Sequence, residues 1–387
     1  MLLISLDGRI DSTNARELEA KVSQELLSAP GQELVFDAEN LQYISSAGLR
    51  VLMKARKAAD HALEIRNVSP EVYEILEMTG FTELLTVKKR MREVSVDGCE
   101  IIGRGYYGTV YRLDPDTIVK VYASPDSISL IENERKMAKL AFMKGIPTAI
   151  SYDIVKVGDS YGSMFELLKA LTLNDMLIKH PEKAEEIIRT FVDVLKSVHE
   201  VELEPGIVPS AKEKWLEYLE LDREQGMVDE RQYTRLRELL TAIPESRHAI
   251  HGDYHMKNVM LAEGEPMLID MDTLAVGDPI FDLQAVYVTY QAFTEDDPGN
   301  SMAFLGIDNE TCDRIWKGTL ANYFKGIPQE KIQALSDKIR LVAAVRFLYL
   351  LCDGSGETDP LTQKRILHTR QHIDELLERV DALTLGG

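Results

Sequence analysis

Hydrophobic and polar positions follow two periods in the first ninety residues. Apolar runs with the length of strands occupy residues 2–6, 33–38 and 62–67. Apolar residues recur at helical spacing over 13–27 and again from Ala47 to about residue 60. A capping Ser69 followed by Pro70 predicts the start of a third helix. Strands and helices that alternate in this way predict a mixed α/β domain over residues 1–90, and the charged, aperiodic segment 86–93 is expected to be its boundary.

A different pattern begins near residue 95. Strand-like runs follow one another over the next seventy residues, at 98–105, 108–113, 117–122, 151–158 and 161–168. They are interrupted by one helical pattern at 129–145, and after residue 170 the signal is mostly helical. A strand-rich segment at 95–168 and a helical segment at 169–387 are therefore expected.

The charge of the chain narrows the classes of partner. The 387 residues carry a formal net charge of −20, and almost all of it falls after residue 92. Such a surface argues against nucleic acid and against an anionic membrane as partners. It attracts cations, but acidic proteins are common, so the charge of any small ligand stays open.

Cysteine usage and hydropathy point to the cytoplasm. Cys99, Cys312 and Cys352 are far apart and show no metal-binding spacing, which favours reduced thiols. The N-terminus has charges too early for a signal peptide. The most apolar long stretch, 341–352, is interrupted by Arg346 and is too short to span a bilayer. A soluble cytoplasmic protein is expected.

A glycine-rich stretch lies between two strand-like runs. Gly103, Gly105, Gly108 and Val110 form a G-x-G-x-x-G-x-V pattern. No helix follows directly, which argues against a dinucleotide-binding fold. A hairpin of this kind can lay backbone N–H groups over nucleotide phosphates, although glycines in a hairpin can equally serve a tight turn.

Lys120 follows in the strand-like run 117–122 and can bind phosphates as a compact point charge. Glu132 and Glu134 on the next helical pattern are candidates to pair with it. Glu134 is preferred because it is three residues from Ile131 and Met137, which are expected to turn inward.

The loop HGDYHMKN at 251–258 and the apolar run MLIDMD at 267–272 complete a set. Phosphoryl transfer needs a carboxylate near the attacking hydroxyl, oxygen ligands for Mg²⁺ and a cation on the phosphates. Asp253 suits the first role, Asn258 and Asp270 suit the second, and Lys120 suits the third. Each residue alone is more typical of a turn or a cap, so the interpretation depends on the ordered set.

Residues 95–387 resemble the aminoglycoside phosphotransferase and choline kinase group, relatives of protein kinases, through HGDxHxxN at 251–258 and IDMD followed by GDPIFDL at 269–283. The resemblance implies an α+β bilobal protein-kinase-like domain that uses ATP and Mg²⁺. It implies that Asp253 is the catalytic base, that Asn258 and Asp270 bind Mg²⁺, and that Lys120 and Glu134 form an ion pair. It also implies a set of supporting residues: an adenine-binding hinge at 164–168 that includes Glu166 and Leu168, an orienting role for His251, a bracing role for Asp278 and Asp282, and Asp272 as a second metal ligand.

Some features depart from protein kinases. The loop has HGD, no DFG or APE follows, and little room remains for an activation segment before residue 277. A small-molecule acceptor is therefore favoured, and it is expected among the helices after residue 170. The stretches 206–220, with Trp215 and Tyr218, and 294–300 can form its walls or can be only packed and connecting segments.

The stretch DAENLQYISSAGLRVLMKA at 37–55 resembles STAS domains, the bacterial anti-sigma factor antagonists, over roughly residues 1–88. Ser46 falls on the family's regulatory phosphoserine and is placed like a helix N-cap. Ser45 replaces the usual aspartate, so Ser46 is either a phosphorylation site or only a cap. The resemblance implies an α/β STAS-like domain and an anti-sigma-type or other STAS-binding partner.

The sequence thus favours an ATP- and Mg²⁺-dependent phosphotransferase that acts on a small-molecule hydroxyl and carries a STAS-like regulatory domain. Two alternatives remain at this point. One is a protein-directed kinase that phosphorylates Ser46 or a partner's serine. The other is a nucleotide-binding regulator without catalysis.

Overall fold

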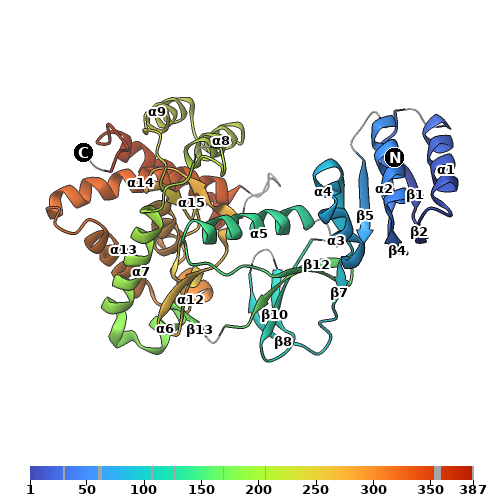
Figure 1. The fold of residues 1–387 in the computed structure, drawn as a ribbon. Helices are drawn as coiled ribbons and strands as arrows, with labels where there is room; N and C mark the ends of the chain where they lie inside the picture. Colours follow the sequence, from blue (N-terminus) through green and yellow to red (C-terminus); the bar gives the residue numbers. More distant parts are fainter. Residues whose placement is uncertain are drawn as a thin grey trace. The chain divides into compact units, whose positions relative to one another are not determined.

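The computed structural model describes residues 1–28, 31–59, 63–105, 108–124, 127–168, 170–204, 206–352 and 359–385. The chain forms two compact units, one of Met1–Asp97 with Ile154–Gly162 and one of Gly98–Asp153 with Ser163–Gly387. Each unit is described by itself below, with the labels of Figure 1.

A parallel sheet forms the centre of the first unit. Its strands lie in the order β1 (Leu2–Ser5), β3 (Leu34–Asp37), β5 (Glu64–Val68) and β6 (Thr86–Lys89). Two short strands, β2 (Gly8–Ile10) and β4 (Leu41–Ile44), pair separately and also in parallel. Near the end of the unit, β7 (Arg92–Glu93) pairs with residues of β11 (Asp153–Val157).

Helices connect the parallel strands, as parallel pairing requires. They are α1 (Ala15–Ser28), α2 (Ser46–Ala58), α3 (Pro70–Met78) and the short α4 (Phe81–Leu84). The predicted α/β alternation is therefore confirmed, including the helix that starts with Ser69 as its cap. Within the segment 86–93, which was expected to be the boundary, residues 86–89 form β6. This is an edge strand, where the charged side chains of Lys88 and Lys89 are tolerated despite hiding the strand pattern.

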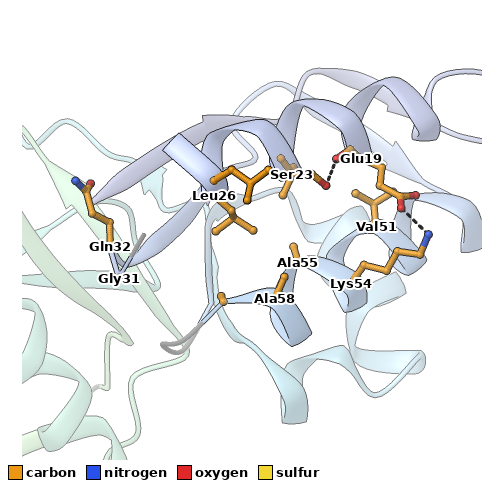
Figure 2. A pocket seen from close by; sticks show the side chains of 12 residues that line it. Glu19, Ser23, Leu26, Gly31, Gln32, Val51, Lys54, Ala55 and Ala58 are labelled. Atoms are coloured by element: carbon orange, nitrogen blue, oxygen red, sulfur yellow. Dashed lines mark hydrogen bonds and ion pairs between the residues drawn. The ribbon is translucent and has the colours of Figure 1, made fainter. Parts of the chain in front are cut away.

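The facing sides of α1 and α2 leave a mostly apolar cavity of about 420 Å³ between them. Figure 2 shows the small side chains of Ala55 and Ala58 on α2 opposite Leu26 on α1, so the two helices do not fill the space between them. An ion pair of 2.6 Å between Lys54 and Glu19 lies at one end of the row. The cavity contains none of the candidate site residues.

The second unit begins with antiparallel strands and one long helix. The strands lie in the order β12 (Ser160–Glu166), β10 (Thr117–Tyr122), β9 (Gly108–Arg112) and β8 (Glu100–Arg104). Helix α5 (Ile128–Met143) packs against the short turn of helix η3 (Met271–Thr273). Its buried face includes Glu134 among apolar neighbours, which identifies that acid as unusual.

The rest of this unit is mainly helical. Its helices are α6 (Leu173–Lys179), α7 (Ala184–His199), α8 (Ala211–Glu224), α9 (Glu230–Thr241), α10 (Ile280–Tyr287), α11 (Phe293–Glu295), α12 (Asn300–Leu305), α13 (Asn309–Tyr323), α14 (Gln329–Leu351) and α15 (Pro360–Leu377). Helix α14 packs against α8, α10 and α15. One large apolar core joins these helices to the inner face of α5.

Short strand pairs hold two loops within this helical part. Strand β14 (Ala249–Ile250) pairs with β17 (Ala275–Val276), and β15 (Val259–Ala262) lies between β13 (Ala170–Thr172) and β16 (Glu265–Leu268). The loop 251–258 therefore runs from β14 to β15, and the segment 269–274 runs from β16 to β17. In the described part of the chain, none of the helices combines the length and the apolar character needed to span a bilayer.

Candidate active site

The backbone of the loop 251–258 is held by a buried carboxylate. Asp282 on α10 accepts hydrogen bonds from the N–H groups of His251 (2.9 Å) and Gly252 (2.6 Å). Gly252 has φ +86°, and a Cβ there would lie 2.7 Å from the carbonyl oxygen of Thr273. Only glycine fits this close approach, which fixes the loop against the segment that contains Asp270.

The ring of His251 is used to orient the loop. Its Nδ1 accepts the N–H of Asp253 at 3.3 Å, so its Nε2 carries the proton and donates to the carbonyl oxygen of Ile269 at 3.1 Å. Thr273 donates its hydroxyl to the carbonyl oxygen of His251 at 2.6 Å. With both ring nitrogens bonded, His251 links the two loops and has no free nitrogen for proton transfer.

Asp253 presents its carboxylate at the surface of this loop. Its side chain is 51% exposed, and Oδ2 lies 3.6 Å from Nε2 of His255. Desolvation opposes ionisation of Asp253, but the neighbouring His255, with a smaller effect from Arg346, lowers its pKa well below the usual range. The carboxylate is therefore ionised at neutral pH and can accept a hydrogen bond from an incoming hydroxyl.

Asn258 lies beside this carboxylate. Its Nδ2 donates to the carbonyl oxygen of Asp253 at 2.9 Å, which orients the amide and leaves Oδ1 available as an oxygen ligand.

A group of charges from three elements surrounds Lys120 of β10. Its Nζ lies 3.1 Å from Oε1 of Glu134 and 2.7 Å from Oδ1 of Asp270, and Tyr122 also donates its hydroxyl to Glu134. Burial alone would lower the pKa of Lys120, but the charges of Asp270 and Glu134 raise it well above the usual value. The lysine is thus a fixed cation between the strands and the segment 269–274.

Asp270 and Asp272 differ although they are two residues apart. Asp270 adopts a left-handed backbone conformation (φ 56°) at the start of η3, and its side chain is 44% exposed. Burial, with smaller effects from Glu134 and Asp270, raises the pKa of Asp272 to about 6. The two carboxylates are therefore not equivalent as metal ligands: burial disfavours the ionised form of Asp272, whereas Asp270 is the more accessible of the two.

The glycine-rich residues lie at the end of β8 and the start of β9. The N–H of Gly105 donates to the carbonyl oxygen of Gly108 at 2.9 Å. A Cβ on Gly108 would lie 2.1 Å from the carbonyl oxygen of Val121, so this glycine allows β9 to approach β10. Gly103 pairs with Val110 across the hairpin, while Tyr106 and Tyr107 of the same motif lie outside the described residues.

Glu166 and Leu168 lie at and after the end of β12, where the N–H of the intervening Leu167 donates to the carbonyl oxygen of Asp116 at 2.8 Å. Among the described residues, no side-chain hydrogen bond or ion pair joins Glu166 or Leu168 to the group around Lys120.

Asp278 lies one residue before Pro279, the N-cap of the helix that carries Asp282. Its Oδ1 accepts the N–H of Ile280 at 2.9 Å, and burial raises its pKa above the usual value. Asp278 thus positions the start of α10, and through it the carboxylate that binds the loop.

Sequence reasoning missed several residues that complete the site. His199 at the end of α7 contacts Oδ2 of Asp282 at 3.0 Å and the hydroxyl of Tyr323 at 2.7 Å. His255, whose charge acts on Asp253, stood within the quoted motif but received no role. His199 is 83 residues from Asp282 in sequence, and its only local signal is a polar ring on the buried face of an amphipathic helix.

The first unit holds the remaining candidate, Ser46. The N-cap of α2 is Ser45, with ψ 174° and its hydroxyl accepting the N–H of Ala47 at 3.2 Å. The expectation that Ser46 is the cap was therefore wrong by one residue. Ser46 is the first helical residue and is exposed, so its hydroxyl is not used by the cap.

The donors around Asp270 fit a magnesium ion bound together with nucleotide phosphates. Among the described residues, no group of three His, Cys, Asp or Glu side chains could hold a metal by itself. Magnesium in such sites takes one or two protein oxygens and completes its octahedron with phosphates and water. Oδ1 of Asn258 and the half-exposed carboxylate of Asp270 supply two such oxygens.

Comparisons with known proteins give similar proteins for both parts of the chain. The model of the phosphotransferase enzyme family matches residues 98–309, and the model of the Mlab STAS domain matches residues 2–86. A protein that carries the name anti-sigma factor antagonist BtrV, from Bordetella bronchiseptica, is 34% identical over 90 residues, which cover 22% of this chain and 77% of that protein. The ADP-bound crystal structure of aminoglycoside phosphotransferase APH(2'')-Ib is similar with a TM-score of 0.50 and 13% identity, over 80% of this chain and 99% of that chain.

Proposed function

Because this chain belongs to the phosphotransferase enzyme family and carries a STAS domain over residues 2–86, we propose that it transfers the γ-phosphoryl group of ATP to a hydroxyl of a small molecule. Family membership makes the chain an ATP-dependent phosphotransferase. The class of acceptor and the role of each residue belong to the proposal.

The observation that carries the proposal is the meeting of Lys120, Glu134 and Asp270 near a loop that presents an ionised Asp253. Asp253 accepts the proton of the attacking hydroxyl, and Lys120 binds the phosphates of ATP. Asn258 and Asp270 hold Mg²⁺, which neutralises charge on the phosphates when it is bound. Asp282 and His251 keep the loop in place by the hydrogen bonds described above.

A small acceptor is favoured because the chain between the two motifs is short. Only seven residues separate Asp270 from Asp278, and β17 within that segment pairs directly with β14. This leaves no segment that could act as the activation loop on which a protein kinase positions a peptide.

A second candidate function is phosphorylation of a STAS serine. The observation behind it is the exposed Ser46 at the first position of α2, where a phosphate would meet free N–H groups of the helix. On this alternative the STAS domain binds an anti-sigma-type partner, and phosphate on Ser46 or on a partner's serine controls that binding.

The test of the main proposal is Asp253→Asn. We expect ATP turnover to fall about 100- to 10,000-fold because the proton acceptor is lost, while binding of a fluorescent ATP analogue persists. Asp193→Asn, on the exposed face of α7, is a matched control that should keep full turnover. Turnover that survives Asp253→Asn would show that another group is the base.

A further inference from the structure

We propose that the acceptor carries an anionic group, a carboxylate or a phosphate, that binds between Arg346 and Lys214. The inference rests on the proposed function and names the chemical class of its acceptor. It begins from two cations on neighbouring helices that the catalytic machinery does not use.

The two cations stand over a pair of stacked tyrosines. Tyr218 of α8 and Tyr349 of α14 have ring centroids 4.0 Å apart at an interplanar angle of 27°. The guanidinium carbon of Arg346 lies 4.9 Å from the ring of Tyr218 and 5.3 Å from that of Tyr349. Nζ of Lys214 lies 6.0 Å from the Tyr218 ring. These four side chains are called the cationic wall below.

Among the described residues, neither cation of this wall forms an ion pair with an Asp or Glu, although Asp272 and Glu217 act on Lys214 from farther away. Other cations on the same two helices do have anionic partners. On α8, Lys212 pairs with Glu245, and on α14, Arg340 pairs with Asp337 at 3.3 Å. Partly buried charges are normally paired, because desolvation without a counter-charge is costly.

The two unpaired cations also act on each other. Burial, and next the charge of Arg346, lower the pKa of Lys214. An anion placed between them would relieve this repulsion and would replace part of the lost hydration. Arg346 offers a planar fork that suits a carboxylate or a phosphate, and Lys214 offers a point charge.

The cationic wall lies beside the candidate catalytic carboxylates. The start of α8 is bonded to the segment that follows Asp270, since the N–H of Val276 donates to the carbonyl oxygen of Pro209 at 2.9 Å. The indole of Trp215 donates to the carbonyl oxygen of Val342 at 3.2 Å and so joins α8 to α14. The charge of Arg346 contributes to the low pKa of Asp253, and Asp272 acts on Lys214 in the sense opposite to Arg346. In the proposal, the hydroxyl of an acceptor bound at the wall faces Asp253.

The cationic wall is expected to prefer anionic acceptors, although the chain as a whole carries a net negative charge. A cationic acceptor, such as the aminoglycosides for which the solved relative is named, would place positive charge against Arg346 and Lys214. The net charge of −20 belongs to the whole chain and does not predict the positive charge of the cationic wall.

The test uses four probes with one skeleton: glycerol, glycerate, glycerol 3-phosphate and 3-aminopropane-1,2-diol. Binding to the full chain is measured by ligand-observed NMR titration with saturating Mg²⁺ and a non-hydrolysable ATP analogue, so that the phosphate positions of the nucleotide are already filled. We expect at least one of the two anionic probes to bind more tightly than glycerol, and the amine to bind least. Whichever anion binds better identifies the group as a carboxylate or a phosphate.

Variants connect that binding to the cationic wall. Arg346→Gln and Lys214→Gln should each weaken the anionic probe about 10- to 100-fold. Arg340→Gln and Lys212→Gln remove paired cations from the same helices and should leave it unchanged. Arg346→Glu should reverse the order of the anionic and cationic probes, which a general loss of folding cannot produce.

Three results would overturn the inference: no preference for either anion over glycerol, equal losses in the control variants, or an unchanged order of probes in a folded Arg346→Glu protein. Asp253-dependent ATP turnover is measured on the same preparation. Its absence in the wild-type protein would contradict the proposed function, whereas its presence without anion binding would contradict only the inference drawn here.

Discussion

The two sides of the candidate active site handle charge in opposite ways. On the nucleotide side, Lys120 lies between Glu134 and Asp270, and each charge has a partner within about hydrogen-bonding distance. On the side of α8 and α14, Arg346 and Lys214 stand over tyrosine rings and form no ion pair with an Asp or Glu among the described residues. The charges around Lys120 are paired before any ligand binds, whereas Arg346 and Lys214 are not.

This difference shows where specificity resides. A paired group can fix the geometry of the phosphates for any acceptor, which suits the part of the site that a whole family shares. An unpaired pair of cations rewards one class of ligand charge and penalises the other. The type of reaction is therefore inferred from the fold. The charge of the acceptor is inferred from the individual side chains of the cationic wall.

The largest effect is expected on the paired side. Lys120→Met removes the central cation and leaves Glu134 and Asp270 to repel each other, so we expect kcat/KM for ATP to fall about 100- to 1000-fold. Steady-state kinetics of ADP release would measure this. Lys136→Met, an exposed lysine on the same helix as Glu134, should behave as wild type. A loss of less than about threefold for Lys120→Met would remove the distinction between the two sides.

A second prediction concerns Asp222, which shares a face of α8 with Lys214 and Tyr218. Asp222 is buried with no partner for either oxygen among the described residues, and burial raises its pKa to about 8. It is therefore mostly protonated at pH 7 and does not neutralise the cationic wall.

The stability of the protein should report this titration. Because the folded pKa lies above the unfolded value near 4, the protein should lose stability as pH rises from about 4 to 8, by about 5 kcal/mol. Asp222→Asn should remove that loss and raise the melting temperature at pH 8 relative to wild type, with a much smaller change at pH 4. An identical pH dependence in both proteins would show that Asp222 ionises normally and is available to pair with a cation.

The smallest expected effect is on the stability of the STAS domain, where a hydrogen-bonded hydroxyl and an exposed hydroxyl stand next to each other. The hydroxyl of Ser45 is bonded to the start of α2, whereas that of Ser46 is exposed. Ser45→Ala should lower the free energy of unfolding of this unit by about 1 kcal/mol, and Ser46→Ala should change it by a few tenths at most. Urea unfolding followed by circular dichroism would compare them. Equal losses would mean that both hydroxyls cap the helix.

Local patterns predicted much of the fold from sequence. Periodicity identified β1, β3, β5, α1 and α2 of the first unit but not the short β2, β4, β7 and α4, and the dipeptide Ser69-Pro70 predicted the start of α3. The prediction was displaced by one residue at Ser45 and Ser46, because two adjacent hydroxyls fit the cap equally well in sequence. It was incomplete at β6, where the charges of an exposed edge strand hide the period.

The contacts between residues far apart in the chain could not be predicted from the sequence. The ordered motifs suggested that Lys120 and Asp270 act together, but their 2.7 Å contact spans 150 residues and depends on how the strands and helices pack. In the sequence, Arg346 stands out as the one charge within an apolar run. Its position over Tyr218 depends on the packing of α14 against α8 and is visible only in the structure.

The most direct test of a small-molecule acceptor is mass spectrometry of the intact protein and of its peptides after incubation with Mg·ATP and no other substrate. The account predicts an unmodified Ser46, together with slow ATP hydrolysis that is lost in Asp253→Asn. Stoichiometric phosphate on Ser46 in the wild-type protein, absent from Asp253→Asn, would contradict it and would make the STAS domain the acceptor.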